Sequence, residues 1–206
     1  MSTMPKKVPI SQKAERRRNS ILEAAIHVVR NGGVDSITHR NVAEEAGVPL
    51  GSITYYFESR EELITESLRH YMRSIEERVE EIVDERLGRP DERDLTIDTI
   101  LDLLVETDVA QEMCVVEYEL IVYAARKKEL LREVRTYRFR FEAQLAAALE
   151  QVGVPRPVLG ARTLLNVVDG FDVERLIRPE DRAADLKQRL ELTVAGVASY
   201  GRESRR

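Results

Sequence analysis

Residues 50–56 concentrate side chains suited to hydrogen bonding with a polyanionic surface. They are small, hydroxylated or aromatic, and none is acidic: Leu50, Gly51, Ser52, Thr54, Tyr55 and Tyr56. Hydroxyl groups bond to phosphates or to the edges of bases, and Thr or Leu side chains can contact the methyl group of thymine. Such a surface could enter the major groove of DNA without repelling the phosphates.

Residues for catalysis are scarce by comparison. The histidines, His27, His39 and His70, fall in separate expected helices and form no H-E-x-x-H or similar ligand pair. The sequence has no glycine-rich phosphate loop after a strand and no G-x-S-x-G motif. The single cysteine, Cys114, lies among apolar residues, which favours an inert buried thiol and argues against disulfides and a four-ligand zinc site. We therefore expect no enzymatic activity, no metal site and no cofactor.

The elements that must position residues 50–56 are expected to be helices. Glycine and proline contribute only 10 and 7 of the 206 residues, and no stretch shows sustained two-residue alternation. Thr38 is a fair N-cap, and Ser59-x-x-Glu62 fits a capping box. The pattern predicts an all-α chain. One helix ends at 31–33, and the others cover 38–46, a short segment after Pro49, 59–87, 94–108, 111–126, 128–152, 157–177 and 180–200.

Two of these helices, separated by Ala46-Gly47-Val48-Pro49, predict a helix-turn-helix. The residues spaced to pack the pair together are Val42, Ala43, Val48 and Ile53. This packing would leave the surface formed by residues 50–56 free. The alternative is an ordinary helical corner in which the tyrosines belong to the core.

Charge is distributed unevenly along the chain, whose net charge is −5. Residues 1–60 hold nine Lys or Arg against six Asp or Glu, whereas the remainder holds 23 against 31. A basic N-terminal part followed by an acidic remainder suggests two functions in one chain, although a basic tail that only increases solubility would give the same charge distribution. The longest uncharged run, 46–57, contains glycine and proline, so we expect no membrane span. Without an apolar signal segment, the sequence predicts a soluble, cytoplasmic protein.

The order and spacing of residues 38–63 resemble the DNA-binding domain of TetR-type transcriptional regulators, and the match covers about residues 15–65. The matching motifs are Thr38-His39-Arg40-Asn41-Val42-Ala43-Glu44-Glu45-Ala46-Gly47-Val48, Gly51-Ser52-Ile53, Tyr55-Tyr56-Phe57 and Arg60-Glu61-Glu62-Leu63. The resemblance implies that these DNA-binding residues are Thr38, His39, Arg40, Leu50, Gly51, Ser52, Thr54, Tyr55, Tyr56 and Arg60. Thr38 would cap its helix and contact phosphate, and Arg60 would clamp phosphate at the start of the long helix.

Three positions depart from the family pattern. Pro49 stands where serine is usual, so it offers no side-chain hydrogen bond. Thr54 replaces the commonest residue, tyrosine, and Arg60 replaces lysine while keeping the charge. We therefore expect base readout through small contacts and DNA shape.

The resemblance also implies a division of the chain into three parts. A basic disordered arm would cover residues 1–12, and a three-helix DNA-binding domain would cover 13–60. A helical bundle that binds an effector and dimerises would cover 61–206. The arm would add affinity for DNA of any sequence or follow the minor groove.

The last two expected helices are the candidates for a two-fold interface, because paired half-sites need a symmetric dimer. The proposed contacts are Leu164, Leu165, Val168, Phe171, Leu186, Leu190, Val194 and Val197. Small residues such as Gly160 and Gly170 would let a partner helix approach closely. The alternative is that both apolar stripes face the core of their own chain.

A small-molecule site would need an apolar cavity with a few convergent polar groups. The candidates are Cys114, Glu117, Tyr118, Tyr137, Phe141, Asn166 and Asp169. An ordinary core or surface role is the alternative for each, and Asp169-Gly170-Phe171 resembles a recurrent pattern of the family. If Glu117 or Asp169 faced a cavity, a cationic or hydroxylated effector would suit it.

These features together predict a homodimeric TetR-type regulator, a repressor that binds a palindromic double-stranded operator and is released by a small molecule. The alternative is a helix-turn-helix protein without an effector that organises DNA or recruits a partner. A cavity in the body would favour the first, and a solidly packed body the second.

Overall fold

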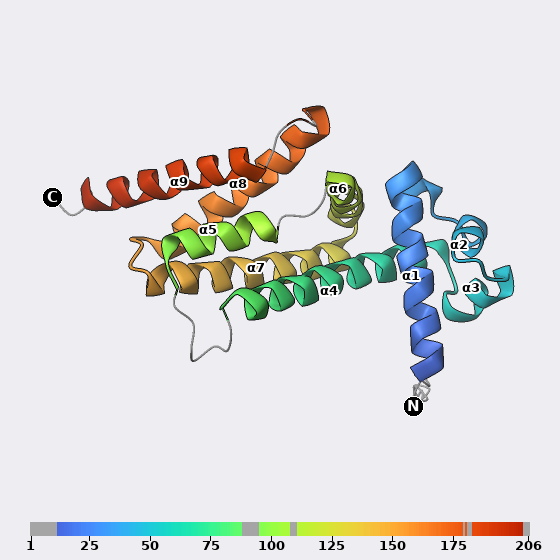
Figure 1. The fold of residues 1–206 in the computed structure, drawn as a ribbon. Coiled ribbons are helices and arrows are strands. Elements are labelled where there is room, and N and C mark those ends of the chain that lie inside the picture. Colours follow the sequence, from blue (N-terminus) through green and yellow to red (C-terminus); the bar gives the residue numbers. More distant parts are fainter. Residues whose placement is uncertain (1–11, 88–94, 108–110, 179, 181–182, 204–206) are drawn as a thin grey trace. The chain divides into compact units, whose positions relative to one another are not determined.

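The computed structural model describes residues 12–87, 95–107, 111–178, 180 and 183–203. These residues form α-helices and one short 3-10 helix, without strands, which confirms the all-α prediction (Figure 1). The chain divides into two compact units, Met1–Tyr71 and Met72–Arg206. The basic arm expected over residues 1–12 lies outside the described residues, apart from Gln12.

The N-terminal unit contains α1 (Gln12–Gly32), η1 (Val34–Ser36), α2 (His39–Glu45), α3 (Leu50–Tyr56) and the first turns of α4 (Arg60–Leu87). Thr38 caps α2, since its Oγ1 accepts a hydrogen bond from the Asn41 backbone N–H at 3.0 Å. Between α2 and α3 the chain turns at Gly47, whose φ of 61° is a conformation that favours glycine. The helix-turn-helix expected from the sequence is therefore present.

The start of α4 is capped as the sequence predicts, with one change of partner. The Glu62 backbone N–H donates to Ser59 Oγ at 3.1 Å, as in a capping box. The Glu62 carboxylate accepts from the backbone N–H of Glu58 at 2.7 Å, one residue before the serine. The first bond satisfies a backbone donor of the first helical turn, and the second ties the residue before the N-cap to the same turn.

The first turns of α4 belong to the N-terminal unit, which ends at Tyr71. Arg18 of α1 pairs with Glu66 of α4, and its guanidinium lies 5.4 Å from the centre of the Phe57 ring. Burial alone would raise the pKa of Glu66, but hydrogen bonds from Arg69 and Arg18 hold it below its usual value. The buried apolar residues of this part of α4 are Leu63, Ile64, Leu68 and Tyr71.

The C-terminal unit contains the rest of α4 and five further helices: α5 (Ile97–Glu106), α6 (Gln111–Ala125), α7 (Lys128–Gln151), α8 (Pro157–Ile177) and α9 (Ala183–Glu203). Helix α8 packs against α7, α9 and α6, and α5 packs against α9 and α7. The bounds of α8 match the expected 157–177. Helix α5 begins at residue 97 rather than 94 because Thr96 caps it, accepting from the Thr99 backbone N–H at 3.1 Å.

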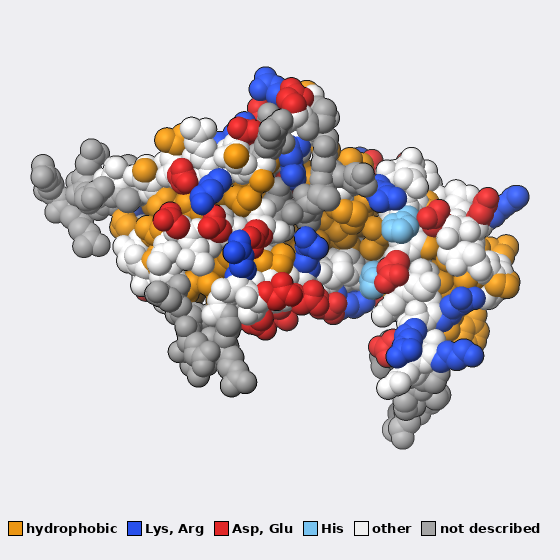
Figure 2. Space-filling model, in the orientation of Figure 1, with side chains coloured by type: hydrophobic (Ala, Val, Ile, Leu, Met, Phe, Trp, Pro, Cys, Tyr) orange, Lys and Arg blue, Asp and Glu red, His pale blue; other side chains and the backbone are white. Residues whose placement is uncertain are grey.

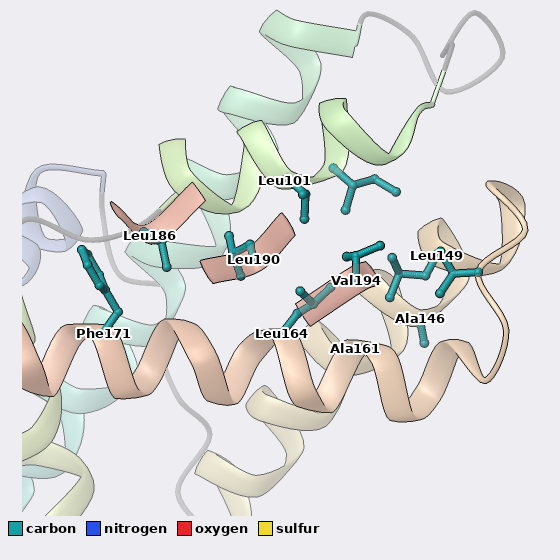
Figure 3. Close-up of a cluster of buried hydrophobic side chains, with 11 residues drawn as sticks. Leu101, Ala146, Leu149, Ala161, Leu164, Phe171, Leu186, Leu190 and Val194 are labelled. Carbon is teal, nitrogen blue, oxygen red and sulfur yellow. The ribbon is translucent and has the colours of Figure 1, made fainter. Parts of the chain in front are cut away.

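The core of this unit contains five of the eight predicted dimer contacts (Figure 3). Leu164, Phe171, Leu186, Leu190 and Val194 are all buried in a cluster with residues of α5 and α7. Val168 and Val197 pack against the same cluster, and Leu165 lines a pocket of the same unit. These five side chains face the core of their own chain, the alternative noted above, which leaves little of their surface accessible to a partner.

Other residues of α8 and α9 remain accessible. Val173 and Ile177 of α8 and Leu192 of α9 are exposed, with Leu192 at 69%. A Cβ added at Gly170 or Gly196 would meet no atom within 4 Å. We call these five residues the outer α8–α9 face. No helix among the described residues is long and apolar enough to cross a membrane.

Candidate functional site

Helix α3 presents the surface predicted from residues 50–56, which we call the recognition surface: Leu50, Gly51, Ser52, Thr54, Tyr55 and Tyr56. Ile53, on the opposite side of the helix, is fully buried. Tyr55 is 81% exposed and Leu50 is 50% exposed, whereas Ser52 and Tyr56 are half-buried. The alternative in which the tyrosines form core therefore fails for Tyr55. The helix contains no charged residue, so nothing on it repels an anion.

The recognition surface has little side-chain bulk near its start. A Cβ added at Gly51 would meet nothing within 4 Å, so a partner can approach the backbone there closely. Thr54 Oγ1 donates to the Gly51 carbonyl at 3.2 Å, which directs its methyl group outward from that bond. The Tyr55 and Tyr56 rings meet edge to face, with centroids 5.0 Å apart. Two phenol groups thus stand together at the end of the helix.

Helix α2 contributes three further predicted residues, Thr38, His39 and Arg40. Thr38 and Arg40 are exposed, and His39 is half-buried. The Nε2 atom of His39 is buried without a hydrogen-bond partner among the described residues. Because the Thr38 hydroxyl caps the helix with a lone pair, its O–H remains able to donate to an acceptor such as a phosphate oxygen.

Arg60 has a bracing role that the sequence did not predict. Its Nε donates to the Ile37 carbonyl at 2.7 Å, and its Nη2 donates to the Val34 carbonyl at 3.0 Å. The same Nη2 lies 3.2 Å from Asp35 Oδ1. These bonds fix the segment between α1 and α2 against the start of α4. Phosphate binding by Arg60 remains a prediction. It would use the N–H groups of the guanidinium that do not take part in these bonds.

A basic groove lies beside the recognition surface. From the sequence we detected only the excess of basic residues in this part of the chain, not the groove. It has a volume of about 660 Å³ and is lined by Lys13, Ala14, Arg16, Arg17, Ser20 and Tyr56. The three cations are exposed and spaced i, i+3 and i+4, so they share one face of α1. Lys and Arg side chains gather around the start of α1 in Figure 2. That spacing could have located the groove from the sequence.

The C-terminal unit contains a pocket of about 540 Å³ bounded by α4, α5, α7 and α8. Its lining is mainly apolar, with Glu80 and Asp84 on α4 as its only charged members among the described residues. Phe141 alone of the predicted ligand residues lines it. The other lining residues are Val79, Val83, Leu87, Leu95, Ile100, Leu103, Leu104, Thr107, Gln144, Leu145, Ala147, Ala148, Gln151 and Leu165.

Two other predicted ligand residues, Tyr118 and Asp169, are hydrogen-bonded to each other instead. Tyr118 donates its hydroxyl to the Asp169 carbonyl oxygen at 2.8 Å, and Arg138 Nη1 donates to Asp169 Oδ1 at 2.9 Å. The ring of Tyr137 lies edge to face with Phe141 at 5.1 Å. Asp169 therefore joins α6, α7 and α8, a structural role that needs no ligand.

The two tyrosines of this region keep their protons. Burial, then the charges of Asp172 and Asp169, raises the pKa of Tyr118 far above its usual value. Burial, followed by the charge of Glu117, does the same to the pKa of Tyr137. Both groups are therefore neutral hydrogen-bond donors at physiological pH.

The remaining predicted ligand residues are dispersed. Cys114 is fully buried, with its Sγ 3.3 Å from Arg175 Nη2, which also bonds to Asp172. Asn166 is exposed on α8. Among the described residues, no three His, Cys, Asp or Glu side chains are grouped to hold a metal ion.

Comparisons with known proteins bear on both units. A family model described as "Bacterial regulatory proteins, tetR family" matches residues 21–66. A second, "Tetracyclin repressor-like, C-terminal domain", matches residues 91–198. The first therefore covers the helix-turn-helix, and the second covers α5 to α8 and most of α9.

Curated relatives and solved structures are similar along most of the chain. The HTH-type transcriptional regulator PksA of Bacillus subtilis is 26% identical over 184 residues, 85% of this chain and 84% of that protein. The nicotine-responsive repressor HdnoR of Paenarthrobacter nicotinovorans is 26% identical, covering 80% of this chain and 86% of its own.

Among solved structures, a transcriptional regulator of Rhodococcus superposes with a TM-score of 0.75 at 21% identity, over 88% of this chain and 96% of that one. This likeness shows the fold. A TetR-family member from Streptomyces coelicolor has a TM-score of 0.63 and 28% identity, over 86% and 97% of the two chains. With a family model matched across more than half of its length and a helix-turn-helix in the expected place, the chain belongs to the TetR family of bacterial transcriptional regulators, which are DNA-binding proteins rather than enzymes.

Proposed function

We propose that the protein represses transcription by binding a palindromic operator as a homodimer, and that a small-molecule effector releases it. The observation that carries the DNA part is the exposed, uncharged recognition surface, with the highly exposed Tyr55 at its end. Small side chains and an accessible backbone at Gly51 suit close contact with base edges.

The basic groove supplies the sequence-independent part of binding in this proposal. Lys13, Arg16 and Arg17 contact backbone phosphates, while Tyr56 joins this contact to the recognition surface. Phosphate contacts hold a protein in register on the duplex, and base contacts select the sequence. The charged residues of the groove suit phosphate contacts, and the small uncharged residues of the recognition surface suit base contacts.

Dimerisation is assigned to the outer α8–α9 face instead of the buried stripe expected from the sequence. Exposed Val173, Ile177 and Leu192 provide apolar contact area. Gly170 and Gly196 provide places where a partner helix can approach closely. The partner would use the same face, as a two-fold interface requires.

The effector part rests on the pocket of about 540 Å³, because a solid body would favour regulation without a ligand. The pocket wall includes Val79, Val83 and Leu87 of α4, and the same continuous helix carries Glu66 and Leu68 within the N-terminal unit. A ligand that shifts α4 would act on both units. The HdnoR relative is by name nicotine-responsive, which supports an effector for this chain as well.

Selection of bound sequences from random duplex DNA tests the proposal. A two-fold symmetric site, protected from cleavage over both halves, is the expected result. Enrichment of a single asymmetric half-site would refute the dimeric operator, and enrichment of no sequence would refute specific binding. A library screen for compounds that release the selected DNA then tests the effector.

A further inference from the structure

Arg60 is the first residue of α4, and its hydrogen bonds reach back to the segment that leads into α2. On the basis of the DNA binding in the proposed function, we infer that Arg60 is a positioning residue. It acts through the backbone of Thr38, the residue at the proposed phosphate-contacting end of α2, and not through a phosphate of its own. This role differs from the phosphate clamp that the family resemblance implies for Arg60.

The guanidinium of Arg60 uses one of its edges as a pair of parallel donors. Nε donates to the Ile37 carbonyl at 2.7 Å, and Nη2 donates to the Val34 carbonyl at 3.0 Å. Two parallel N–H groups are also what allows an arginine to bind a phosphate in a bidentate way. Because backbone carbonyls occupy this edge, a phosphate could reach only Nη1 without breaking these bonds.

The carbonyl that accepts from Nε is directly linked to Thr38. It belongs to the planar peptide unit that also contains the Thr38 backbone nitrogen, so holding it fixes the direction in which the chain enters α2. Thr38 is extended, with φ −132° and ψ 154°, and its Oγ1 accepts from the Asn41 backbone N–H. The Thr38 O–H, the proposed donor to phosphate, is therefore carried by backbone that Arg60 holds in place.

The same segment is held from the α2 side as well. Asn41 Nδ2 donates to the Ser36 carbonyl at 2.8 Å, and the Ile37 side chain is fully buried. Asp35 contributes less, because its side chain is fully exposed where its Oδ1 lies 3.2 Å from Arg60 Nη2. An exposed ion pair of this kind adds little stability. The bonds to the backbone carbonyls are therefore the ones that position Thr38.

Two substitutions separate positioning from phosphate binding, since lysine keeps the charge of Arg60 without its paired donors and glutamine lacks the charge. Arg60→Lys and Arg60→Gln should both weaken operator binding by about tenfold, the size of one lost hydrogen bond to a charged group. Both should keep the wild-type dependence of affinity on salt. A lysine variant with wild-type affinity, or a glutamine variant whose salt slope is shallower by about 2 for the dimer, would show a phosphate contact and overturn the inference.

A double-mutant cycle tests whether the effect passes through Thr38. Thr38→Val removes the hydroxyl and should weaken binding when Arg60 is present. In the Arg60→Lys background the same change should cost much less, because the hydroxyl is no longer held toward the phosphate. Equal costs in the two backgrounds would show independent contributions and overturn the inference.

Asp35→Asn is the matched control within the same set of contacts. It removes the exposed ion pair but leaves both carbonyl bonds in place, so it should not weaken DNA binding. A loss as large as that of Arg60→Lys would assign the effect to the ion pair and contradict positioning through the backbone.

Affinities are measured by anisotropy at a temperature at which circular dichroism shows each variant to be folded. A purely stabilising role of Arg60 would lower the melting temperature and leave these affinities unchanged, which would also refute positioning. Random duplex DNA provides a second substrate, because a backbone contact is made with any sequence. Failure to select a symmetric operator would refute the proposed operator, whereas the comparison of variants on random DNA would still decide the role of Arg60.

Discussion

The basic groove on α1 leads to a quantitative prediction about salt. Each subunit places Lys13, Arg16 and Arg17 on one exposed face, so a dimer offers six such cations. Each phosphate contact lowers the slope of log affinity against log salt concentration by about 0.9. If all six cations contact phosphates, replacing the three residues with glutamine should make the slope shallower by about 5. Arg16→Gln alone should change it by about 2.

The measurement is fluorescence anisotropy of a labelled operator duplex across a salt series, for the wild type and each variant. If the groove contacts only the DNA backbone, as proposed, the variants should weaken binding to specific and to random DNA by the same factor. The ratio of the two affinities should therefore remain that of the wild type. Arg126→Gln, an exposed arginine between α6 and α7, is the matched charge control and should leave the slope unchanged.

Two results would refute this reasoning. A triple variant with the wild-type slope would show that the groove does not contact DNA. A slope that changes equally in the Arg126 control would show that only the net charge of the chain matters. Circular dichroism of the triple variant should match the wild type, because all three side chains are exposed and Arg18, the neighbour that braces α4, is retained.

Four further outcomes are expected from other parts of the chain. Gly51→Ala should keep or raise the melting temperature, because its Cβ meets open space, yet should lower operator affinity by about 1–3 kcal/mol in anisotropy titrations. Arg60→Lys should lower the melting temperature, since an ammonium cannot bridge two carbonyls as the guanidinium does. Leu192→Arg should give a folded monomer in sedimentation experiments, whereas Leu190→Arg should unfold the chain because Leu190 is fully buried. The lowered pKa of Glu66 stabilises the fold above the usual value of 4.5, so the deficit of Glu66→Gln in chemical denaturation should shrink as the pH falls below it.

Local signals in the sequence were sufficient for the helix-turn-helix. Thr38 and Ser59 cap helices where their types and spacing predict, and the turn at Gly47 has the backbone conformation expected of glycine. These features depend on residues within a few positions of one another, so a sequence states them directly. The role of Arg60 escaped prediction because its acceptors, Ile37 and Val34, lie more than twenty residues away.

The pocket was missed for a related reason. The predicted ligand residues were chosen for polar or aromatic character within apolar helices. Two of them, Tyr118 and Asp169, instead bond to each other, and Arg138 pairs with the Asp169 carboxylate. The actual pocket is built from ordinary aliphatic residues of four helices, with its charges at an exposed edge. The apolar spacing of Val79, Val83 and Leu87 on α4 was visible in the sequence. What it faced depended on how α5, α7 and α8 pack, which no local pattern specifies.

Helix α8 has apolar residues on two sides, so helical spacing alone does not indicate which side a partner would contact. Helix α8 buries Leu164 and Phe171 in its own core and also exposes Val173 and Ile177. Both sets follow helical spacing, but the larger and more regular set packs in the core of its own chain. Glycine within the helix does not decide the side either, because a Cβ added at Gly160 would lie 3.4 Å from Leu149 of the same chain, whereas one added at Gly170 would meet no atom within 4 Å. In the proposed dimer, a partner helix would approach α8 at Gly170, which faces open space and lies on the same helix as the exposed Val173 and Ile177.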